Sequence, residues 1–206
     1  MDYNRIISNS MHYVTYLLNC HLKPTIKFHN FHHTLSVVEA CSTMAMFYQL
    51  SEEKRAILIT SAWFHDVGYI KTTEGHEAVS KEFLIDFFKD KEVPKDFIQK
   101  CCQCIEATTL GHQPKNKLEA IIKDADYNHV ISDNYWVLNE RLKKEIESLN
   151  DIQLTQEIWY ERNLMFLSSL TFATSYYEVK FQGKKEQRIK ENEAILRSFT
   201  SLKTAI

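Results

Sequence analysis

Residues 56–69 of the chain read AILITSAWFHDVGY. The part from 56 to 64 is apolar almost all round a helix, which is typical of a helix buried at the centre of a fold. Ser51-Glu52-Glu53 supplies a capping serine and acidic residues in the first turn, where the helix dipole favours negative charge. Val67-Gly68-Tyr69 follows directly, and glycine readily closes a helix. We therefore expect a central helix that ends at His65-Asp66 and delivers these two side chains into the core.

His65 and Asp66 are neighbours, and neighbouring side chains on a helix point about 100° apart. They can reach one ion only at a helix end or in a distorted turn, which is where the glycine places them. His33 upstream and Asp126 downstream supply a second imidazole and a second carboxylate. Two imidazoles and two carboxylates suit a borderline divalent metal that keeps open positions for water. The four residues therefore form a candidate ligand set.

The composition favours one compact, all-α domain. Of the 206 residues, 44% are hydrophobic and 25% charged, which is ordinary for a soluble globular protein. Only four glycines and three prolines interrupt the chain, so few tight turns are available and long helices are favoured. We expect a single domain over residues 1–206, with a motif-bearing core over about residues 28–130 and C-terminal helices over about residues 134–200.

Local patterns place loops at about residues 68–74 and 108–116, and a helix at about residues 118–130. The segment from about residue 155 to residue 177 is the most aromatic part of the chain, and its helical spacing predicts core packing. The stretch 182–185, Gln-Gly-Lys-Lys, predicts a solvated turn before a terminal amphipathic helix.

Charge and cysteine content narrow the function classes. A net charge of -2 gives no global attraction to phosphate backbones, so an extended nucleic-acid surface is not expected. The N-terminal residues lack a basic start followed by a long apolar segment, and the longest apolar runs are too short to cross a bilayer. Five cysteines, an odd number, favour reduced thiols. We expect a cytoplasmic protein without a membrane partner.

Four elements of the sequence, in this order, resemble the HD superfamily of metal-dependent phosphohydrolases. Residues 28–34 resemble an aromatic-His-Asn-x-x-His element, and residues 62–69 a hydrophobic-His-Asp-hydrophobic-Gly element. Residues 75–80 resemble the His-Glu-x-x-Ser of one bacterial branch, and residues 123–126 the closing Asp-x-Asp. A chance His-Asp dipeptide is common, but four elements in this order are not. The resemblance covers about residues 28–130 and implies an all-α HD-type fold.

The resemblance also implies a metal ligand set of His33, His65, Asp66 and Asp126. Asp124 is the alternative to Asp126, because two residues apart on a helix they face different directions and only one should reach the ion. We favour Asp126, with Asp124 as a hydrogen-bond acceptor behind it.

Further histidines are candidates for catalysis. His29 is spaced i, i+4 from His33, which would place both on one helix face, and it aligns with a histidine that protonates the leaving oxygen in cyclic-nucleotide phosphodiesterases. The alternative is a histidine held by Asn30 or a backbone carbonyl that only orients a ligand. His76 and His112 could bind a second ion or steady a phosphate. Glu77 could orient His76 or accept a proton. Of the cations, Lys71, Lys123 and Arg162 lie nearest to the motifs.

The function implied is a metal-dependent hydrolase that acts on a nucleotide or another small phosphate ester or anhydride through a metal-activated water, with Asp66, His29 and His76 in catalytic roles. The cofactor would be Mn, Mg, Co, Ni, Fe or Zn, and the partner a small phosphorylated substrate. The C-terminal helices could support a homodimer. One alternative is a di-iron HD-type oxygenase that uses His76 and His112 as ligands. Another is a non-catalytic binding protein in which the metal only stabilises the fold.

Overall fold

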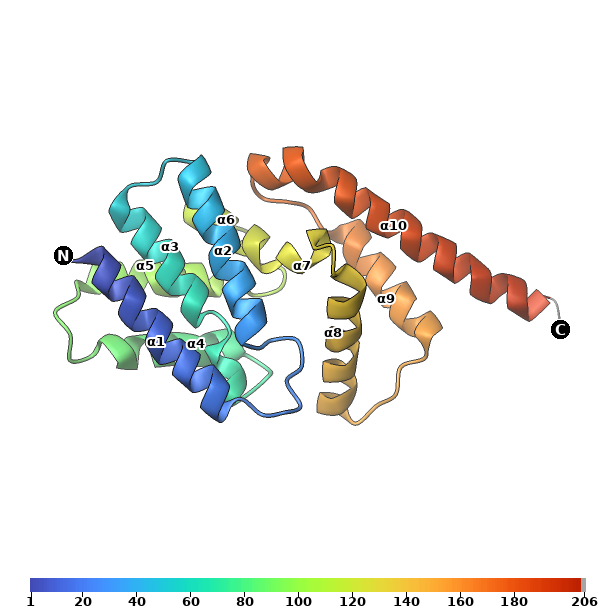
Figure 1. Cartoon of the computed structure of the whole chain (residues 1–206), viewed down its shortest axis with the longest axis horizontal. Helices are drawn as coiled ribbons and strands as arrows, with labels where there is room; N and C mark the ends of the chain where they lie inside the picture. The colour runs from blue at the N-terminus through green and yellow to red at the C-terminus, as the bar shows by residue number, and fades with distance from the viewer. Residues whose placement is uncertain (205–206) are drawn as a thin grey trace. The chain divides into compact units, whose positions relative to one another are not determined.

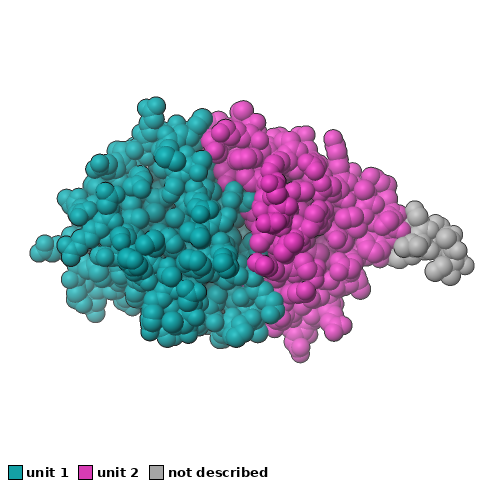
Figure 2. Space-filling model, in the orientation of Figure 1, with its two compact units in different colours: residues 1–128 teal, residues 129–206 magenta. Residues whose placement is uncertain are grey.

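The computed structural model describes residues 1–204, with side chains through residue 199, and the elements in this range are helices joined by short connections (Figure 1). The prediction of an all-α fold is confirmed. The chain forms two compact units, Met1–Asn128 and His129–Ile206, which are coloured separately in Figure 2. This division falls where the sequence places the end of the motif-bearing core, whereas a single domain stays a prediction.

Unit 1 is built around one central helix. Its elements are α1 (Tyr3–His21), α2 (Phe31–Phe47), α3 (Glu52–Phe64), the 3-10 turn η1 (Val67–Ile70), α4 (His76–Phe88), α5 (Lys95–Glu106) and α6 (Lys117–Asp126). The short helix α7 (Asn128–Ile131) begins at the last residue of unit 1. Helix α3 packs against α1, α2 and α5 (Figure 1). Its residues 56–64 are all buried. The predicted central helix is therefore confirmed.

Three helices that carry the candidate ligands begin at capping side chains. Asn30 caps α2 and accepts hydrogen bonds from the backbone N–H groups of His32 at 2.9 Å and of His33 at 3.4 Å. Ser51 caps α3 in the predicted way. Asn116 caps α6 by accepting from two backbone N–H groups of its first turn. Because each cap satisfies amides that the helix itself leaves unpaired, the start of each helix is tied to one residue.

A glycine allows the segment after α3 to lie directly against α4. An ideal Cβ at Gly68 would lie 2.0 Å from the carbonyl oxygen of His76, so only a residue without a side chain fits there. The Gly68 N–H donates to Ser80 Oγ at 2.8 Å across the same contact. The predicted loop over residues 68–74 is thus partly wrong: its start is the regular turn η1, held by Ser80 of α4.

Unit 2 contains α8 (Tyr135–Asn150), α9 (Gln156–Ser169) and α10 (Ser175–Thr204), and α9 packs against α10. The aromatic segment spans α9, the non-helical residues 170–174 and the start of α10, and its Trp159, Phe172, Tyr176 and Tyr177 are buried, as predicted. One sequence prediction needs correction here. The predicted turn at 182–185 is wrong, because Gly183 lies inside α10. A single glycine costs a helix only about 1 kcal/mol, and the Lys and Glu residues around it are good helix formers.

Buried asparagines link the three long helices of unit 2. Asn139 of α8 donates to Asn163 of α9 at 3.0 Å, and Asn163 donates to Asn192 of α10 at 3.0 Å. Trp159 donates its indole N–H to Asn139 at 2.6 Å. All four side chains are buried. Since a buried amide is costly unless it is hydrogen-bonded, this network favours one register of the three helices over others.

All five cysteines are free thiols, and Cys41, Cys101 and Cys104 are buried. Burial raises the pKa of Cys104 to about 12, so this thiol stays protonated near neutral pH. Among the described residues, we find no helix with the combination of length and apolarity that a bilayer span requires.

Candidate metal centre

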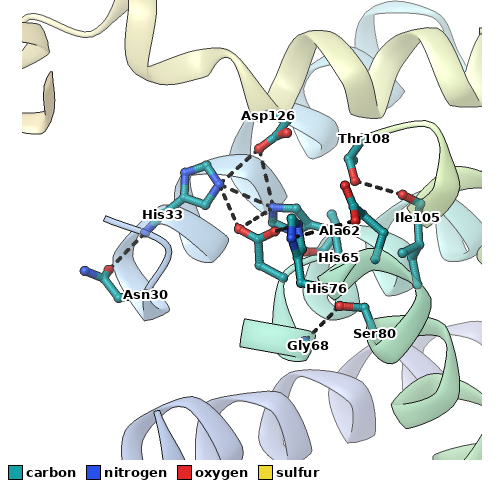
Figure 3. A network of polar contacts seen from close by, with 12 residues as sticks. Asn30, His33, Ala62, His65, Gly68, His76, Ser80, Ile105, Thr108 and Asp126 are labelled. Carbon is teal, nitrogen blue, oxygen red and sulfur yellow. Dashed lines mark hydrogen bonds and ion pairs between the residues drawn. The ribbon is translucent and has the colours of Figure 1, made fainter. Parts of the chain in front are cut away.

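Four side chains from three helices meet at one point in unit 1 (Figure 3). His33 comes from α2, His65 and Asp66 from the end of α3, and Asp126 from the last position of α6. One potential ligand atom of each lies within 4.8 Å of those of the other three. Nε2 of His33 is 3.0 Å from Oδ1 of Asp126 and 3.3 Å from Nε2 of His65. The structure therefore brings together the four residues that the sequence singles out.

The end of α3 turns both members of the His65-Asp66 pair toward this point. The helix ends at Phe64, and Asp66 leaves it with φ -109° and ψ 5°, so the usual angle between helical neighbours no longer applies. Nδ1 of His65 donates to the carbonyl oxygen of Ala62 at 2.8 Å. With its proton on Nδ1, the neutral imidazole presents the lone pair of Nε2 to the cluster. This is the tautomer that a metal ligand needs.

The distances within the cluster fit a divalent ion. Ligand atoms at about 2.0–2.2 Å from a metal lie about 3 Å apart when adjacent and just over 4 Å apart when opposite. Oδ2 of Asp66 lies 3.2 Å from Nε2 of both His33 and His65. It is buried, yet neither contact has hydrogen-bond geometry. A buried carboxylate oxygen without a hydrogen bond, facing two imidazole nitrogens, is what the removal of a shared cation would leave.

The electrostatics of the cluster also call for positive charge. Burial lowers the pKa of His33, but the hydrogen bond to Asp126 and the charges of Asp66 and Asp126 outweigh burial and raise the pKa to about 9. Burial likewise opposes protonation of His65, but the Asp66 charge outweighs it and the pKa of His65 rises. Burial alone would raise the pKa of Asp66, yet the charge of His65 holds it well below its usual range. In the metal-free protein, imidazole protons balance the two carboxylates, and a divalent cation could replace them.

Residues 30–131 match the family model of the HD domain. This chain belongs to the HD-domain superfamily. That superfamily consists in general of metal-dependent phosphohydrolases, and its name describes the adjacent pair that ends α3 here. The HD protein is also similar to a structural-genomics target from Lactobacillus plantarum, with 15% sequence identity, a TM-score of 0.68 and 98% of each chain covered. At that identity the likeness shows the fold alone. No curated protein matches the chain.

Asp124 and Asp126 of the HD protein differ in the way that their spacing predicts. Oδ1 of Asp126 faces Nε2 of His33 at 3.0 Å and Nε2 of His65 at 3.5 Å. Asp124 is fully buried on α6 and is not one of the four converging residues. The geometry therefore favours Asp126 as the direct ligand, and the role of Asp124 as a hydrogen-bond acceptor behind it stays a prediction.

His29 lies beside the cluster, but the predicted shared helix face is wrong. Helix α2 begins at Phe31, and Asn30 is its cap, so His29 precedes the helix. The physical reason is that an asparagine favours the capping position over a helix interior. The ring of His29 still packs at right angles to that of His33, with centroids 5.5 Å apart. The Asn30 side chain binds backbone groups at Lys27, His32 and His33.

His76 reaches the centre from the first residue of α4. Its Nε2 lies 3.4 Å from Oδ1 of Asp66, the carboxylate oxygen that does not face His33 and His65. Its Nδ1 lies 3.1 Å from the carbonyl oxygen of Thr73, to which it can donate. Oε2 of Glu77 lies 3.7 Å from the same nitrogen, which agrees with an orienting role. His76 therefore presents Nε2 to the side of Asp66 that the other ligands leave open.

His112 is not brought into the cluster. Its Nε2 lies 3.5 Å from Oε2 of Glu119, a buried carboxylate on α6. The same oxygen accepts a hydrogen bond from the backbone N–H of Lys115 at 2.7 Å. This pair ties the loop before α6 to that helix. Sequence reasoning missed Glu119, and also Ser80 as the partner of Gly68. For Ser80, the sequence did contain a signal, because its i, i+4 spacing from His76 places both residues on one face at the start of α4.

Proposed function

We propose that this HD protein is a hydrolase that cleaves a nucleotide or another small phosphate ester or anhydride with the help of one divalent cation. The observation that supports this most strongly is the buried cluster of two histidines and two aspartates, whose ligand atoms lie within 4.8 Å of one another. The proposed ligands are His33, His65, Asp66 and Asp126. A divalent ion bound by these residues would lower the pKa of a coordinated water toward 7 and polarise a phosphoryl oxygen.

The side chains around the cluster have complementary tasks in this proposal. The two carboxylates hold the cation, and the hydrogen bond from His65 to Ala62 keeps its ring oriented. His29 is half-buried beside His33 and supplies a proton to the leaving oxygen. Lys123, one turn before Asp126 on α6, contacts the phosphate. Its Nζ lies 3.4 Å from the Thr109 carbonyl oxygen, a weak contact that a phosphate oxygen could replace.

The di-iron alternative has partial geometric support. His76 faces the free oxygen of Asp66, so Asp66 could bridge two ions there. The second histidine that this alternative uses, His112, contacts Glu119 instead. A purely structural metal would need only the four converging residues and predicts a closed coordination sphere. We favour the hydrolase because His29 and His76 lie beside the four residues and Lys123 lies one turn before Asp126, so the centre has groups near it that can exchange protons or bind phosphate.

The test is release of inorganic phosphate from a panel of nucleotides and simple phosphate esters with Mn, Mg, Co, Ni, Fe or Zn. Asp66→Asn keeps the shape of the side chain and removes its charge, whereas Asp96→Asn makes the same change at an exposed position of α5. We expect metal-dependent turnover that Asp66→Asn abolishes and Asp96→Asn retains. Absence of turnover with every metal, or equal turnover in both variants, would overturn the proposal. Two irons per chain with oxygen consumption would favour the oxygenase.

A further inference from the structure

Tyr69 contacts both histidines that lie next to the four proposed ligands. Its ring stacks on His29, with centroids 4.3 Å apart and planes inclined by 9°. It also packs against His76, with centroids 4.1 Å apart and planes inclined by 32°. The two imidazoles themselves are further apart, with centroids 6.4 Å from each other. Both imidazoles therefore contact the same ring, that of Tyr69.

Tyr69 is also firmly attached to the metal centre. It lies in η1, three residues after Asp66, and its backbone N–H donates to the Asp66 carbonyl oxygen at 3.1 Å. The preceding Gly68 is held to Ser80 of α4 by a buried hydrogen bond. Tyr69 is only 9% exposed. Its position therefore follows that of the Asp66 backbone.

The two histidines, by contrast, lie at or next to the start of a helix. His29 belongs to the connection between α1 and α2, one residue before the cap of α2. His76 is the first residue of α4 and follows Gly75, which has φ 65°. Side chains at element ends depend on neighbouring rings and hydrogen bonds for their orientation. Here the neighbour that the two histidines have in common is Tyr69.

We infer that Tyr69 is a positioning residue that sets the orientation of His29 and His76 relative to Asp66. Ring orientation is a property of the metal-free protein and can be tested without any substrate. The consequence for turnover rests on the proposed function, in which His29 donates a proton. A misplacement of about 1 Å at a reacting group can cost about 100-fold in rate.

The contact is made by the faces of the rings, so the aromatic ring and not the hydroxyl should matter. Tyr69→Phe keeps the ring and removes the hydroxyl. Tyr69→Leu removes the ring and keeps a buried apolar side chain. Tyr69→Met is a second variant without a ring, whose flexible side chain fills irregular space if leucine prevents folding. Tyr48→Leu is the matched control, because Tyr48 packs edge-on against Phe47 at the other end of α2.

The first experiment records the imidazole Cε1–H resonances of the metal-free full chain by NMR, with His29 and His76 assigned from His29→Gln and His76→Gln spectra. A stacked ring shifts these resonances upfield. We expect the shifts to persist in Tyr69→Phe and Tyr48→Leu and to disappear in the leucine and methionine variants. Unchanged shifts in both variants without a ring, or loss of the shifts in Tyr69→Phe, would overturn the inference.

The second experiment measures turnover in the same variants. We expect kcat to fall about 10- to 100-fold in Tyr69→Leu with little change in KM, and the phenylalanine variant to restore it. A wild-type kcat in Tyr69→Leu would overturn the catalytic part. If the wild-type protein hydrolyses no phosphate compound, the proposed function fails, whereas the NMR experiment still decides whether Tyr69 orients the two histidines.

Discussion

Gly68→Ala tests how the chain brings α4 to the metal centre. The new Cβ would lie 2.0 Å from the His76 carbonyl oxygen, 2.8 Å from its carbonyl carbon and 3.0 Å from its Cα. All three are backbone atoms of the first residue of α4, so no side chain can rotate away. Relief requires a shift of about 1 Å between η1 and α4, and forced overpacking of this kind costs about 1–3 kcal/mol. Because the obstacle is backbone, we expect about 3 kcal/mol.

Two measurable changes follow from this shift. A loss of about 3 kcal/mol should lower Tm by about 6–12 °C in a protein of this size. The shift also moves His76, whose Nε2 is now 3.4 Å from Oδ1 of Asp66. A displacement of about 1 Å there should reduce kcat about 100-fold. Thermal unfolding followed by circular dichroism measures the first effect, and phosphate release measures the second.

Gly183→Ala is the matched control. Gly183 lies inside α10, and an added Cβ there meets no atom within 4 Å. Alanine in a helix is favoured over glycine by up to about 1 kcal/mol, so this variant should be slightly more stable than the wild type. The same substitution should therefore have opposite effects at the two positions. A Gly68→Ala variant with wild-type Tm and turnover would refute the close approach of η1 and α4.

Three further predictions concern single interactions. Ser80→Ala leaves the buried Gly68 N–H without its acceptor and should lower the free energy of unfolding by about 1–3 kcal/mol. Urea titrations measure this loss, and an unchanged free energy of unfolding would contradict the 2.8 Å hydrogen bond. In the chelator-treated protein, the pKa of His33 is raised to about 9, whereas in the unfolded chain it lies near 6.5. The stabilisation that protonated His33 provides is therefore complete below about pH 6.5 and is lost as the pH rises through about 9. Tm should therefore fall over that window while metal affinity rises, and a rising Tm would refute the pairing. Asn163→Leu leaves the amide of Asn139 without its acceptor and should destabilise unit 2 by about 1–3 kcal/mol, measured as faster hydrogen exchange in α8 and α9.

The sequence was most informative where local signals agreed with one another. A capping serine, an apolar run and a glycine together predict the start, burial and end of α3, and the structure shows all three. The His65-Asp66 pair could then be placed at a helix end from sequence alone. Its convergence with His33 and Asp126 is a long-range contact that no local pattern shows, and the family resemblance supplied it.

Other features depend on contacts that a sequence pattern cannot reveal. The asparagines of unit 2 have ordinary polar spacing, and only the packing of three helices makes them a buried network. Gly183 looks like a turn residue, yet its surroundings hold it in a helix. Tyr69 reads as one more apolar residue after the HD pair. The two residues that it contacts, His29 and His76, lie before and after it in the sequence, so no local pattern around Tyr69 indicates either contact.

The central claim is that four dispersed side chains bind one cation. A structure determined with Mn²⁺, with the ion located by anomalous scattering, tests this most directly. We predict an ion at about 2.0–2.3 Å from Nε2 of His33, Nε2 of His65 and one oxygen each of Asp66 and Asp126, with at least one position occupied by solvent. An ion bound elsewhere, or a cluster that keeps its internal contacts and holds no ion in the presence of Mn²⁺, would contradict the account.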